Sequence, residues 1–400
     1  MVRKKYLSNT WIELSETAYA GNLAFFRELV GPRRELSVVV KANGYGHGWQ
    51  SIARLAARHG ADSFCVHSLD EALRLRRAGF TQNVLIMGHV PLARLEEVVE
   101  GKFRLVLFNR ETLERLAEIT EARAALVRVH LKIETGTHRW GVSGDELRWF
   151  LDRLKQTPRI MLEAVYTHFA NIEDTRNADY ADYQKYQFHQ QMKLLKEAGF
   201  SIFKKHAACT AAVLLFPDTH FDMVRLGIGQ YGLWPSAETL ASSRSRHGDD
   251  VRDRLTPVMT WKTRVSQLKW VAPDNTIGYG RTTRTTRETR LAVLPVGYSD
   301  GYPRALSNVG VVLIRGQRAP VRGRICMNVM MVDVTHIAGV TLEDEVVLLG
   351  RQGTEVLTPE EVAAAAGTIA YEIVARINPD IPRVLVDMEP DTDAPSDADA

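Results

Sequence analysis

The chain has few cysteines and no long apolar run, and these shortages exclude several classes of protein. Its cysteines, Cys65, Cys209 and Cys326, are odd in number and far apart. They are therefore not the paired framework of a small secreted domain, and a reducing, cytoplasmic location is expected. No apolar stretch approaches the roughly 18 residues that span a bilayer. The basic N-terminus runs into polar residues instead of a signal-peptide core, so no membrane partner is expected.

An excess of one charge is also missing. The formal net charge is +3, which is too small to favour nucleic acid or an anionic membrane as a partner. The apolar fraction of 45% and the charged fraction of 25% are ordinary for a globular protein. A chain of 400 residues is long enough for two or three domains with a sizeable core.

The first part of the chain, residues 1–240, has the pattern of a closed parallel barrel. Short apolar strands alternate there with longer helical stretches, which indicates βαβ units. Eight such units over roughly 200–250 residues are typical of a (β/α)8 TIM-like barrel. The eight expected strands are Ser37–Ala42, Ser63–Val66, Val84–Met87, Arg104–Phe108, Leu126–Ile133, Met161–Phe169, Phe203–Ala208 and Met223–Gly227.

The second part, residues 255–388, predicts a mostly antiparallel β domain. A polar stretch, Ser236–Arg254, is expected to be the linker that precedes it. One helix is expected after Thr358, which with Glu361 forms a capping box. The acidic tail, residues 389–400, is expected to be disordered. The expected strands are Val258–Leu268, Thr289–Pro295, Val311–Ile314, Val321–Ile325, Met330–Val334 and Glu345–Leu349.

Lys41 stands at the end of the first barrel strand. It closes the run Val38-Val39-Val40 and opens the glycine-rich stretch Ala42–Gly48. The carboxyl ends of barrel strands carry the active site, and desolvation there lowers the pKa of an amine and frees its lone pair for Schiff-base chemistry. A lysine taken alone is more simply a solvated strand end, but the rest of the chain favours the reactive interpretation.

A glycine run after the eighth strand predicts a phosphate site. The stretch Gly227–Gly232 matches GxGxxG, but Trp234-Pro235 and a polar segment follow in place of the helix and acid of a dinucleotide site. Barrels often bind phosphate among the loops after strands seven and eight, where backbone N–H groups form an anion nest. An imine-forming lysine across the barrel mouth from a phosphate site suggests pyridoxal 5′-phosphate. The expected phosphate contacts are Thr210, Gly227, Ile228 and the hydroxyl of Tyr45.

Two further rim residues are candidates for contacts with that cofactor. If Arg225 faces the pyridine nitrogen, it can only donate, because a guanidinium stays protonated. The ring would then be a weaker electron sink, which suits removal and return of a proton better than transamination. An ion pair between Arg225 and Asp222 is an equally good interpretation. His168 is either a packed core histidine or a residue lying against the cofactor ring.

The fifth strand carries a polar row in a place where both faces are covered. Arg128, His130 and Lys132 alternate with apolar residues, and both faces of a barrel strand are usually buried. The row must therefore be buried and paired, and Lys132 and Arg139 are candidates to anchor a substrate carboxylate. His206 and Cys209 have ligand-like spacing, but no second pair accompanies them, so no metal site is expected.

Taken together, these residues resemble the alanine racemase family, which pairs a barrel with a C-terminal β domain. The resemblance runs from about Trp11 to Arg383. Val39–Gly48 is similar to the cofactor-lysine signature, and Val224–Ile228 resembles the site for the pyridine nitrogen and phosphate. The remaining similar segments are Ile277–Gly280 and Pro295–Gly301, around the second base, and Gly323–Met327, the substrate loop.

The resemblance implies interconversion of L- and D-alanine, for peptidoglycan, by two bases. One base would return the proton mainly to the face it left, so a racemase needs a second base opposite. Lys41 would serve the face of the D-enantiomer and Tyr279 that of the L-enantiomer. A free tyrosine has a pKa near 10, so Tyr279 must be activated, through His168 and Arg225.

The resemblance also implies further contacts. Tyr279 and Met327 would reach the barrel of a partner subunit in a head-to-tail homodimer with shared active sites. Arg139 and the Met327 backbone would bind the carboxylate of the amino-acid substrate. Lys132 stands where some relatives carry a carboxylated lysine.

The chain departs from the family pattern at three places, which leaves alternatives open. Cys209-Thr210 replaces Asn-Ser, Asn328 replaces aspartate and Pro379 replaces tyrosine. The last two changes could widen the entrance, so a broader-specificity or serine racemase is the first alternative. A decarboxylase is less favoured, because Arg225 stands where such enzymes place a carboxylate. A non-catalytic cofactor carrier would lack the β domain that bears Tyr279.

Overall fold

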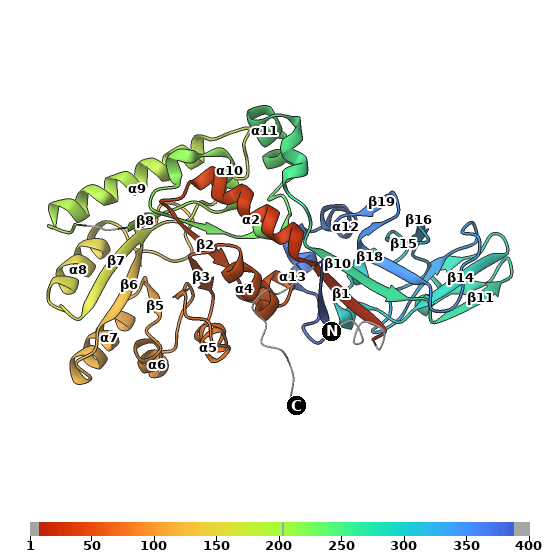
Figure 1. The fold of residues 1–400 in the computed structure, drawn as a ribbon, viewed down its shortest axis with the longest axis horizontal. Coiled ribbons are helices and arrows are strands. Elements are labelled where there is room, and N and C mark those ends of the chain that lie inside the picture. The colour runs from red at the N-terminus through yellow and green to blue at the C-terminus, as the bar shows by residue number, and fades with distance from the viewer. Residues whose placement is uncertain (1–7, 202–203, 388–400) are drawn as a thin grey trace. The chain divides into compact units, whose positions relative to one another are not determined.

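The computed structural model describes residues 8–201 and 204–387 (Figure 1). The chain forms two compact units, each built from more than one segment of the sequence. The barrel unit contains Ala20–Gly44 and Ile52–Thr256. The β unit contains the residues up to Tyr19, Tyr45–Ser51 and the residues from Pro257 onward. The sequence suggested consecutive domains, 1–240 and 255–388, whereas the described chain passes between the units more than once. The expected tail, 389–400, lies outside the described residues.

The barrel unit contains, within the described residues, an eight-stranded sheet of parallel neighbours in the order β8-β7-β6-β5-β4-β3-β2-β9. The two strands at the ends of this order, β8 and β9, are also joined by hydrogen bonds, which closes the sheet. The Arg225 N–H donates to the Ala208 carbonyl at 3.0 Å, and the Asp222 N–H donates to the Lys205 carbonyl at 3.1 Å. The predicted barrel is thereby confirmed. Its strands are β2 (Glu35–Val39), β3 (Ser63–Val66), β4 (Asn83–Ile86), β5 (Arg104–Leu107), β6 (Val127–Lys132), β7 (Ile160–Tyr166), β8 (Lys204–His206) and β9 (Met223–Leu226).

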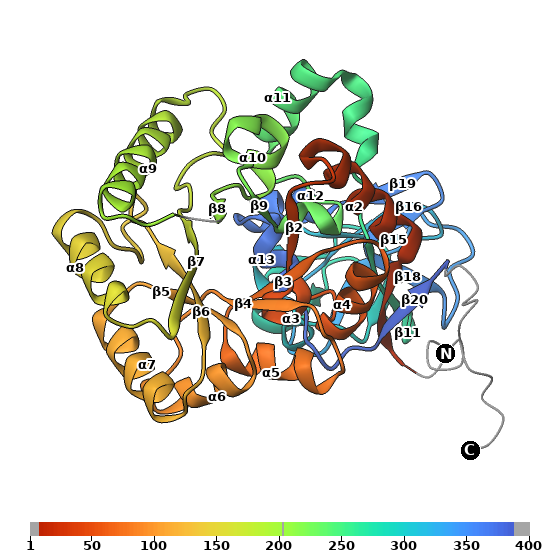
Figure 2. The same cartoon turned by 60° about the vertical axis from the view of Figure 1, so that its left-hand side comes forward.

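Helices cover the outside of these strands, as Figure 2 shows for α5 to α9. Local signals set the ends of these helices: Ser68 and Glu71 form a capping box at the start of α5, with the Glu71 N–H donating to Ser68 Oγ at 3.3 Å. None of the helices in the described chain is both long and apolar enough to cross a bilayer. The helices are α2 (Glu16–Val30), α4 (Trp49–Arg58), α5 (Leu69–Arg77), α6 (Leu95–Glu100), α7 (Arg110–Ala122), α8 (Gly144–Lys155), α9 (Asp179–Glu197) and α10 (Thr210–Leu215).

The segment predicted to be a linker, Ser236–Arg254, is helical instead. It forms α11 (Ala237–His247) and the 3-10 helix η4 (Asp249–Arg254). Ser236 caps α11 by accepting the Thr239 N–H at 3.0 Å, and His247 Nε2 bonds with the Leu214 carbonyl at 3.0 Å. The prediction was wrong because a polar composition indicates exposure and not backbone conformation. The serine cap was the signal that should have been read.

The β unit is built on a main sheet in the order β16-β15-β18-β10-β1-β20, with β19 on β18. Strand β1 lies between two strands from much later in the sequence: Ile12 pairs with Trp261 antiparallel and with Arg383 in parallel. Trp11, Trp261 and Tyr302 are buried here. The strands are β1 (Thr10–Ser15), β10 (Met259–Arg264), β15 (Val311–Ile314), β16 (Gln317–Pro320), β18 (Glu345–Gln352), β19 (Glu355–Leu357) and β20 (Arg383–Val386).

A second, antiparallel sheet and two helices complete the β unit. The sheet comprises β11 (Gln267–Val271), β14 (Thr289–Leu294) and β17 (Met330–Asp333), and a short ribbon pairs β12 (Thr276–Ile277) with β13 (Thr283–Arg284). The expected helix is α12 (Pro359–Ala366), where the Glu361 N–H donates to Thr358 Oγ1 at 3.1 Å. Helix α13 (Ala370–Ala375) was not predicted. The fold class, a barrel followed by a mostly antiparallel domain, is confirmed.

Two expected strands of the β unit differ from the structure. Val258–Leu268 is divided between β10 and β11, which lie in different sheets. In the described structure Val321–Ile325 is not a strand, and Val321 makes only an isolated bridge to Val332. Gly323 adopts a φ of +78° and its N–H donates to Asn308 Oδ1 at 2.6 Å. The alternation of residues there resembled a strand, but the left-handed glycine turns the chain away from the sheet.

Candidate active site

Lys41 directly follows Val40 at the carboxyl end of β2, in the barrel unit. The side chain is half-buried, and burial lowers the pKa of its amine. The positive charge of Arg139 lowers that pKa further, while Glu71 acts in the opposite direction. A lowered pKa increases the neutral fraction of the amine, which is the form that attacks an aldehyde.

The turn after Lys41 has an unusual backbone. In α3 (Lys41–Tyr45) the φ angles of Ala42, Asn43 and Gly44 are +52°, +55° and +61°. Left-handed helical conformation costs about 1–2 kcal/mol for each residue with a Cβ. Two bonds hold it: the Ala42 N–H donates to Glu71 Oε1 at 2.8 Å, and the Gly44 N–H donates to the Val40 carbonyl at 3.0 Å. Backbone strain of this kind is typical of functional sites.

Gly46, in the β unit, gives a test of how tightly the glycine-rich stretch is held. Its φ is +78°, and a Cβ there would overlap the Val374 carbonyl oxygen. We expect Gly46→Ala to lower the free energy of unfolding by about 2 kcal/mol or more, because both backbone strain and overpacking act. Gly60→Ala is the control, since φ is +89° but the added methyl meets open space. Urea midpoints would measure both, and equal losses would contradict the close contact.

Lys132, the last residue of β6, is 3% exposed. Its ammonium nitrogen lies 5.7 Å from the ring centres of both Trp140 and Tyr166. Burial, with the positive charges of Arg139 and Arg225, lowers the pKa of Lys132 to about 8. Of the polar row predicted on this strand, His130 and Lys132 are buried but Arg128 is exposed. The buried lysine is held between aromatic rings among positive charges.

Arg225, on β9, is 4% exposed and packed on the ring of Tyr166, with 4.8 Å between the guanidinium carbon and the ring centre. Its Nη2 donates to the carbonyls of Thr167 at 2.9 Å and Ala207 at 3.0 Å. Its Nη1 donates to Nδ1 of His206. The guanidinium is thus fixed in the barrel interior by acceptors on three sides.

The alternative of an Arg225–Asp222 ion pair is not what the structure shows. Asp222 instead accepts the backbone N–H of Lys205 at 2.8 Å. His168 Nδ1 lies 3.4 Å from Arg225 Nη2. Burial, and then the positive charges of Arg225, Arg139, Lys132 and Lys41, hold the pKa of His168 well below its usual range. The neutral imidazole therefore stands among the four cationic residues that the sequence singled out on this rim.

Three of the four residues expected to bind phosphate, Thr210, Gly227 and Ile228, belong to the barrel unit. Thr210 Oγ1 accepts the N–H groups of Gly227 and Gly229, each at 3.2 Å. A Cβ on Gly229 would overlap Phe26 and Thr210, so this glycine serves packing. Ile228 is fully buried. The four-residue 3-10 helix η3 (Ile228–Tyr231) follows, in place of the long helix that a dinucleotide site requires.

The other predicted residues belong to the β unit. Tyr279 begins the 3-10 helix η5 (Tyr279–Arg281) and is 72% exposed, and Met327 is 56% exposed. The Ser299 N–H donates to the Met327 carbonyl at 2.9 Å, which ties the expected base segment to the expected substrate loop. Tyr45 packs against Tyr371, with 6.1 Å between ring centres. The structure thus places Tyr45, Tyr279 and Met327 on one unit and the remaining candidates on the other.

Sequence reasoning assigned no role in this site to several of its residues. Tyr166 lies beneath Arg225 and Lys132, and Trp140 stacks on Phe108 with 5.1 Å between ring centres. Glu71, part of the capping box of α5, also holds the turn after Lys41. Tyr166 ends a barrel strand as Lys132 does, and that position was the available signal. Among the described residues, no group of three or more histidine, cysteine, aspartate or glutamate side chains could hold a metal ion.

The fold and the rim define the class: an α/β-barrel enzyme with a C-terminal β domain and a desolvated lysine on a barrel strand end. Family models for the alanine racemase N-terminal domain and the alanine racemase C-terminal domain match residues 14–235 and 258–385. The chain therefore belongs to the alanine racemase family, whose members are pyridoxal-phosphate-dependent isomerases.

Similar proteins cover nearly the whole chain. The alanine racemase of Leptospira interrogans is 37% identical over 381 residues, covering 95% of this chain and 96% of that protein. The alanine racemase of Desulforamulus reducens is 39% identical, covering 94% and 98%. An alanine racemase from Bacillus anthracis with bound L-Ala-P has a TM-score of 0.88 and 34% identity, covering 94% and 95%. An alanine racemase from Bartonella henselae with covalently bound pyridoxal phosphate has a TM-score of 0.83 and 25% identity, covering 95% and 100%.

Proposed function

We propose that this enzyme interconverts L- and D-alanine with bound pyridoxal 5′-phosphate, using Lys41 and Tyr279 as its two bases. The observation that carries the proposal is the half-buried Lys41, whose lowered pKa leaves a reactive amine at a barrel strand end. The covalently bound pyridoxal phosphate of the Bartonella henselae relative supports it. The names of the curated relatives support alanine as the substrate.

The residues of the barrel unit fit the cofactor. When bound, pyridoxal 5′-phosphate supplies an aldehyde that bonds to amines and a ring that accepts electron density from the substrate Cα. Lys41 offers the amine, and the buried Arg225 offers a donor for the ring nitrogen. Phosphate binding is assigned to Thr210, Gly227, Ile228 and the Tyr45 hydroxyl.

The two bases handle the α-proton from opposite faces of the substrate. Lys41 removes or returns it on the face of D-alanine, and Tyr279 does so on the face of L-alanine. A tyrosine must lose its own proton to act as a base near neutral pH. The neutral His168, held 3.4 Å from Arg225, has a ring nitrogen that can accept a hydrogen bond and so assist that loss. Arg139 and the Met327 backbone hold the substrate carboxylate.

Lys132 is proposed to be carboxylated. The lone pair of its neutral amine bonds to the carbon of carbon dioxide and an N–H proton is released, which leaves a carbamate that the Arg139 charge stabilises. Only the unprotonated amine reacts, so the fraction of carbamate should rise as pH passes upward through the lowered pKa of about 8. NMR of protein equilibrated with carbon-13 bicarbonate would show one protected carbamate signal. Lys132→Ala should remove that signal, and its absence above pH 8 would leave Lys132 as a plain amine.

The reaction can be tested directly with the purified holoenzyme in heavy water. L-Alanine, L-serine and L-lysine are supplied separately, and α-proton exchange and D-product are followed for each. We expect alanine to react fastest. A comparable rate with serine would favour the broader-specificity alternative, which the changes at Asn328 and Pro379 suggest, and release of carbon dioxide would favour the decarboxylase. Borohydride treatment should leave a pyridoxyl adduct on Lys41, and no adduct would contradict the proposal.

The proposal extends to assembly and location. We propose that the exposed Tyr279 and Met327 reach the barrel of a second copy, in a head-to-tail homodimer with shared active sites. The enzyme is proposed to work in the cytoplasm and to supply D-alanine for peptidoglycan. Sedimentation velocity of the holoenzyme would test the assembly, with a dimer expected at micromolar concentration.

A further inference from the structure

A row of five polar side chains crosses the interior of the barrel unit from Arg225 to Arg104. Arg225 Nη1 donates to His206 Nδ1. His206 Nε2 lies 3.0 Å from His130 Nδ1, and His130 Nε2 lies 3.0 Å from Glu163 Oε2. Glu163 Oε1 accepts from Arg104 Nη2 at 2.8 Å. The five residues come from β9, β8, β6, β7 and β5, so the row links Arg225 to a carboxylate on the other side of the sheet's interior.

The two ends of the row fix the direction of every hydrogen bond in it. A guanidinium can only donate, so His206 Nδ1 must accept from Arg225 and its proton must sit on Nε2. That Nε2–H donates to His130 Nδ1, and the Nε2–H of His130 then donates to Glu163. An ionised carboxylate can only accept. Both imidazoles are therefore neutral and share one tautomer.

The electrostatics of the row agree with this assignment. Burial lowers the pKa of His130 despite the nearby Glu163 carboxylate, and burial with the charge of Arg225 holds the pKa of His206 well below its usual range. Burial would raise the pKa of Glu163, but hydrogen bonds from His130 and Arg104 outweigh it, and the pKa lies far below its usual value. The carboxylate is ionised and the histidines are uncharged.

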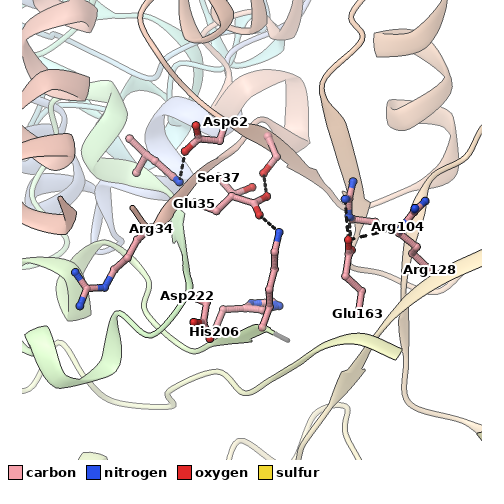
Figure 3. Close-up of polar contacts among 12 residues, drawn as sticks. Arg34, Glu35, Ser37, Asp62, Arg104, Arg128, Glu163, His206 and Asp222 are labelled. Carbon is pink, nitrogen blue, oxygen red and sulfur yellow. Dashed lines mark hydrogen bonds and ion pairs between the residues drawn. The ribbon is translucent and has the colours of Figure 1, made fainter. Parts of the chain in front are cut away.

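A β-bulge brings Glu163 into the row. Val129 on β6 pairs with Leu162, but the next residue, His130, pairs with Ala164. Glu163 is thus the extra residue of β7, and such a residue leaves the regular alternation of side chains. Figure 3 shows it beside Arg104 and Arg128, and its Oε1 lies 3.9 Å from the Nε of Arg128. Because of the bulge, Glu163 has no pairing partner on β6, and its carboxylate is directed at His130.

We propose that His206, His130 and Glu163 are positioning residues. They keep an acceptor nitrogen facing the Arg225 guanidinium and so hold it in one orientation as a hydrogen-bond donor. The inference rests on the proposed function, since it concerns the residue assigned to the cofactor's ring nitrogen. If the His206 proton sat on Nδ1, an N–H would face the guanidinium and repel it. The Glu163 carboxylate prevents that tautomer through His130. The row therefore sets the orientation of Arg225 and its strength as a donor from a carboxylate two imidazoles away.

The tautomers can be observed without any variant. Neutron diffraction from deuterated crystals of the holoenzyme should show deuterium on Nε2 and none on Nδ1 of both His206 and His130. Deuterium on Nδ1 of His206 would overturn the proposal, whatever the activity of the enzyme. This measurement stands even if a substitution in the row prevents folding.

The link to Arg225 can be measured as cofactor affinity. We expect Glu163→Gln to weaken pyridoxal phosphate binding about fivefold and to shift the absorbance of the bound cofactor, since the row loses its charged end. Glu114→Gln is the matched control: Glu114 also accepts two bonds from one arginine, Arg153, at 2.8 and 2.7 Å. That pair lies on helices away from the row, so its loss should leave affinity and spectrum unchanged.

Substitutions of His130, in the middle of the row, test whether Glu163 acts on Arg225 through this relay of hydrogen bonds or only through packing. In His130→Phe, which fills the space without hydrogen bonds, adding Glu163→Gln should weaken binding no further. His130→Gln, which can both accept and donate, should restore most of the affinity. Equal effects of Glu163→Gln and Glu114→Gln would overturn the relay while leaving the proposed function intact. Failure of the wild type to bind pyridoxal phosphate would overturn both.

Discussion

Lys41→Ala should abolish racemisation, with a fall in kcat of about 10⁴-fold. The substitution removes two roles at once, the amine that bonds to the cofactor aldehyde and the base that serves the face of D-alanine. Loss of a positioned proton-transfer group alone costs about 10²–10⁴-fold, and loss of the covalent attachment adds to it. Product chirality assays and borohydride labelling, followed by peptide mass analysis, would measure both roles.

A surface lysine provides the control. Lys155 on α8 makes a solvent-exposed ion pair with Asp152 at 3.6 Å, and such pairs contribute little to stability. Lys155→Ala should therefore keep full activity and the adduct on Lys41. A Lys41→Ala variant that still carried a borohydride-fixed adduct on another lysine, with activity retained, would show that the attachment site was assigned to the wrong residue.

Tyr279→Phe should separate the two faces of the reaction. The phenyl ring keeps the shape of the side chain but lacks the hydroxyl that takes up and returns the proton, so racemisation should fall by about 10²–10⁴-fold. Exchange of the α-proton of D-alanine, on the Lys41 face, should persist in heavy water, whereas exchange from L-alanine should be lost. Cofactor absorbance should remain, because Lys41 is intact. Deuterium uptake by each enantiomer, followed by mass spectrometry, measures the asymmetry.

Two controls sharpen this experiment. Tyr186 on α9 is 59% exposed, and Tyr186→Phe should leave both exchange rates unchanged. Mixing Lys41→Ala with Tyr279→Phe protomers should restore activity, because a shared dimer would then contain one site with both native residues. Full activity of Tyr279→Phe would refute the two-base assignment, and no recovery on mixing would argue against sites shared between subunits.

Much of the barrel could be predicted from local pattern. Apolar runs such as Val84–Met87 are short and bounded by polar turns. A run of that length that alternates with helices is typical of a buried strand in a parallel sheet. The position of Lys41 followed from the same rule, because a residue that ends a barrel strand must lie on the rim. Its lowered pKa then required only that the rim be partly desolvated.

The remainder depended on contacts between distant segments. The polar row on β6 implied a buried partner for His130, but the partner, Glu163, is reached only through a bulge. Regular alternation cannot reveal an extra residue in a strand. The helical conformation of Ser236–Arg254 was missed for a different reason. Its polar side chains indicate only that the segment faces solvent, and it is held in place by hydrogen bonds to backbone carbonyls of α10, which a sequence pattern does not reveal. Helix α13 was missed because six residues give too little periodicity.

The position of β1 constrains how the protein can be made. Strand β1 is synthesised long before its neighbours β10 and β20, because Val386 follows Ser15 by about 370 residues. At ribosomal speeds of about 5–20 residues per second, the N-terminal strand waits roughly 20 to 70 s for its last neighbour. During translation its apolar face must be shielded by chaperones or nascent-chain contacts. Stalled synthesis that delays release of β20 should therefore leave the main sheet of the β unit incomplete.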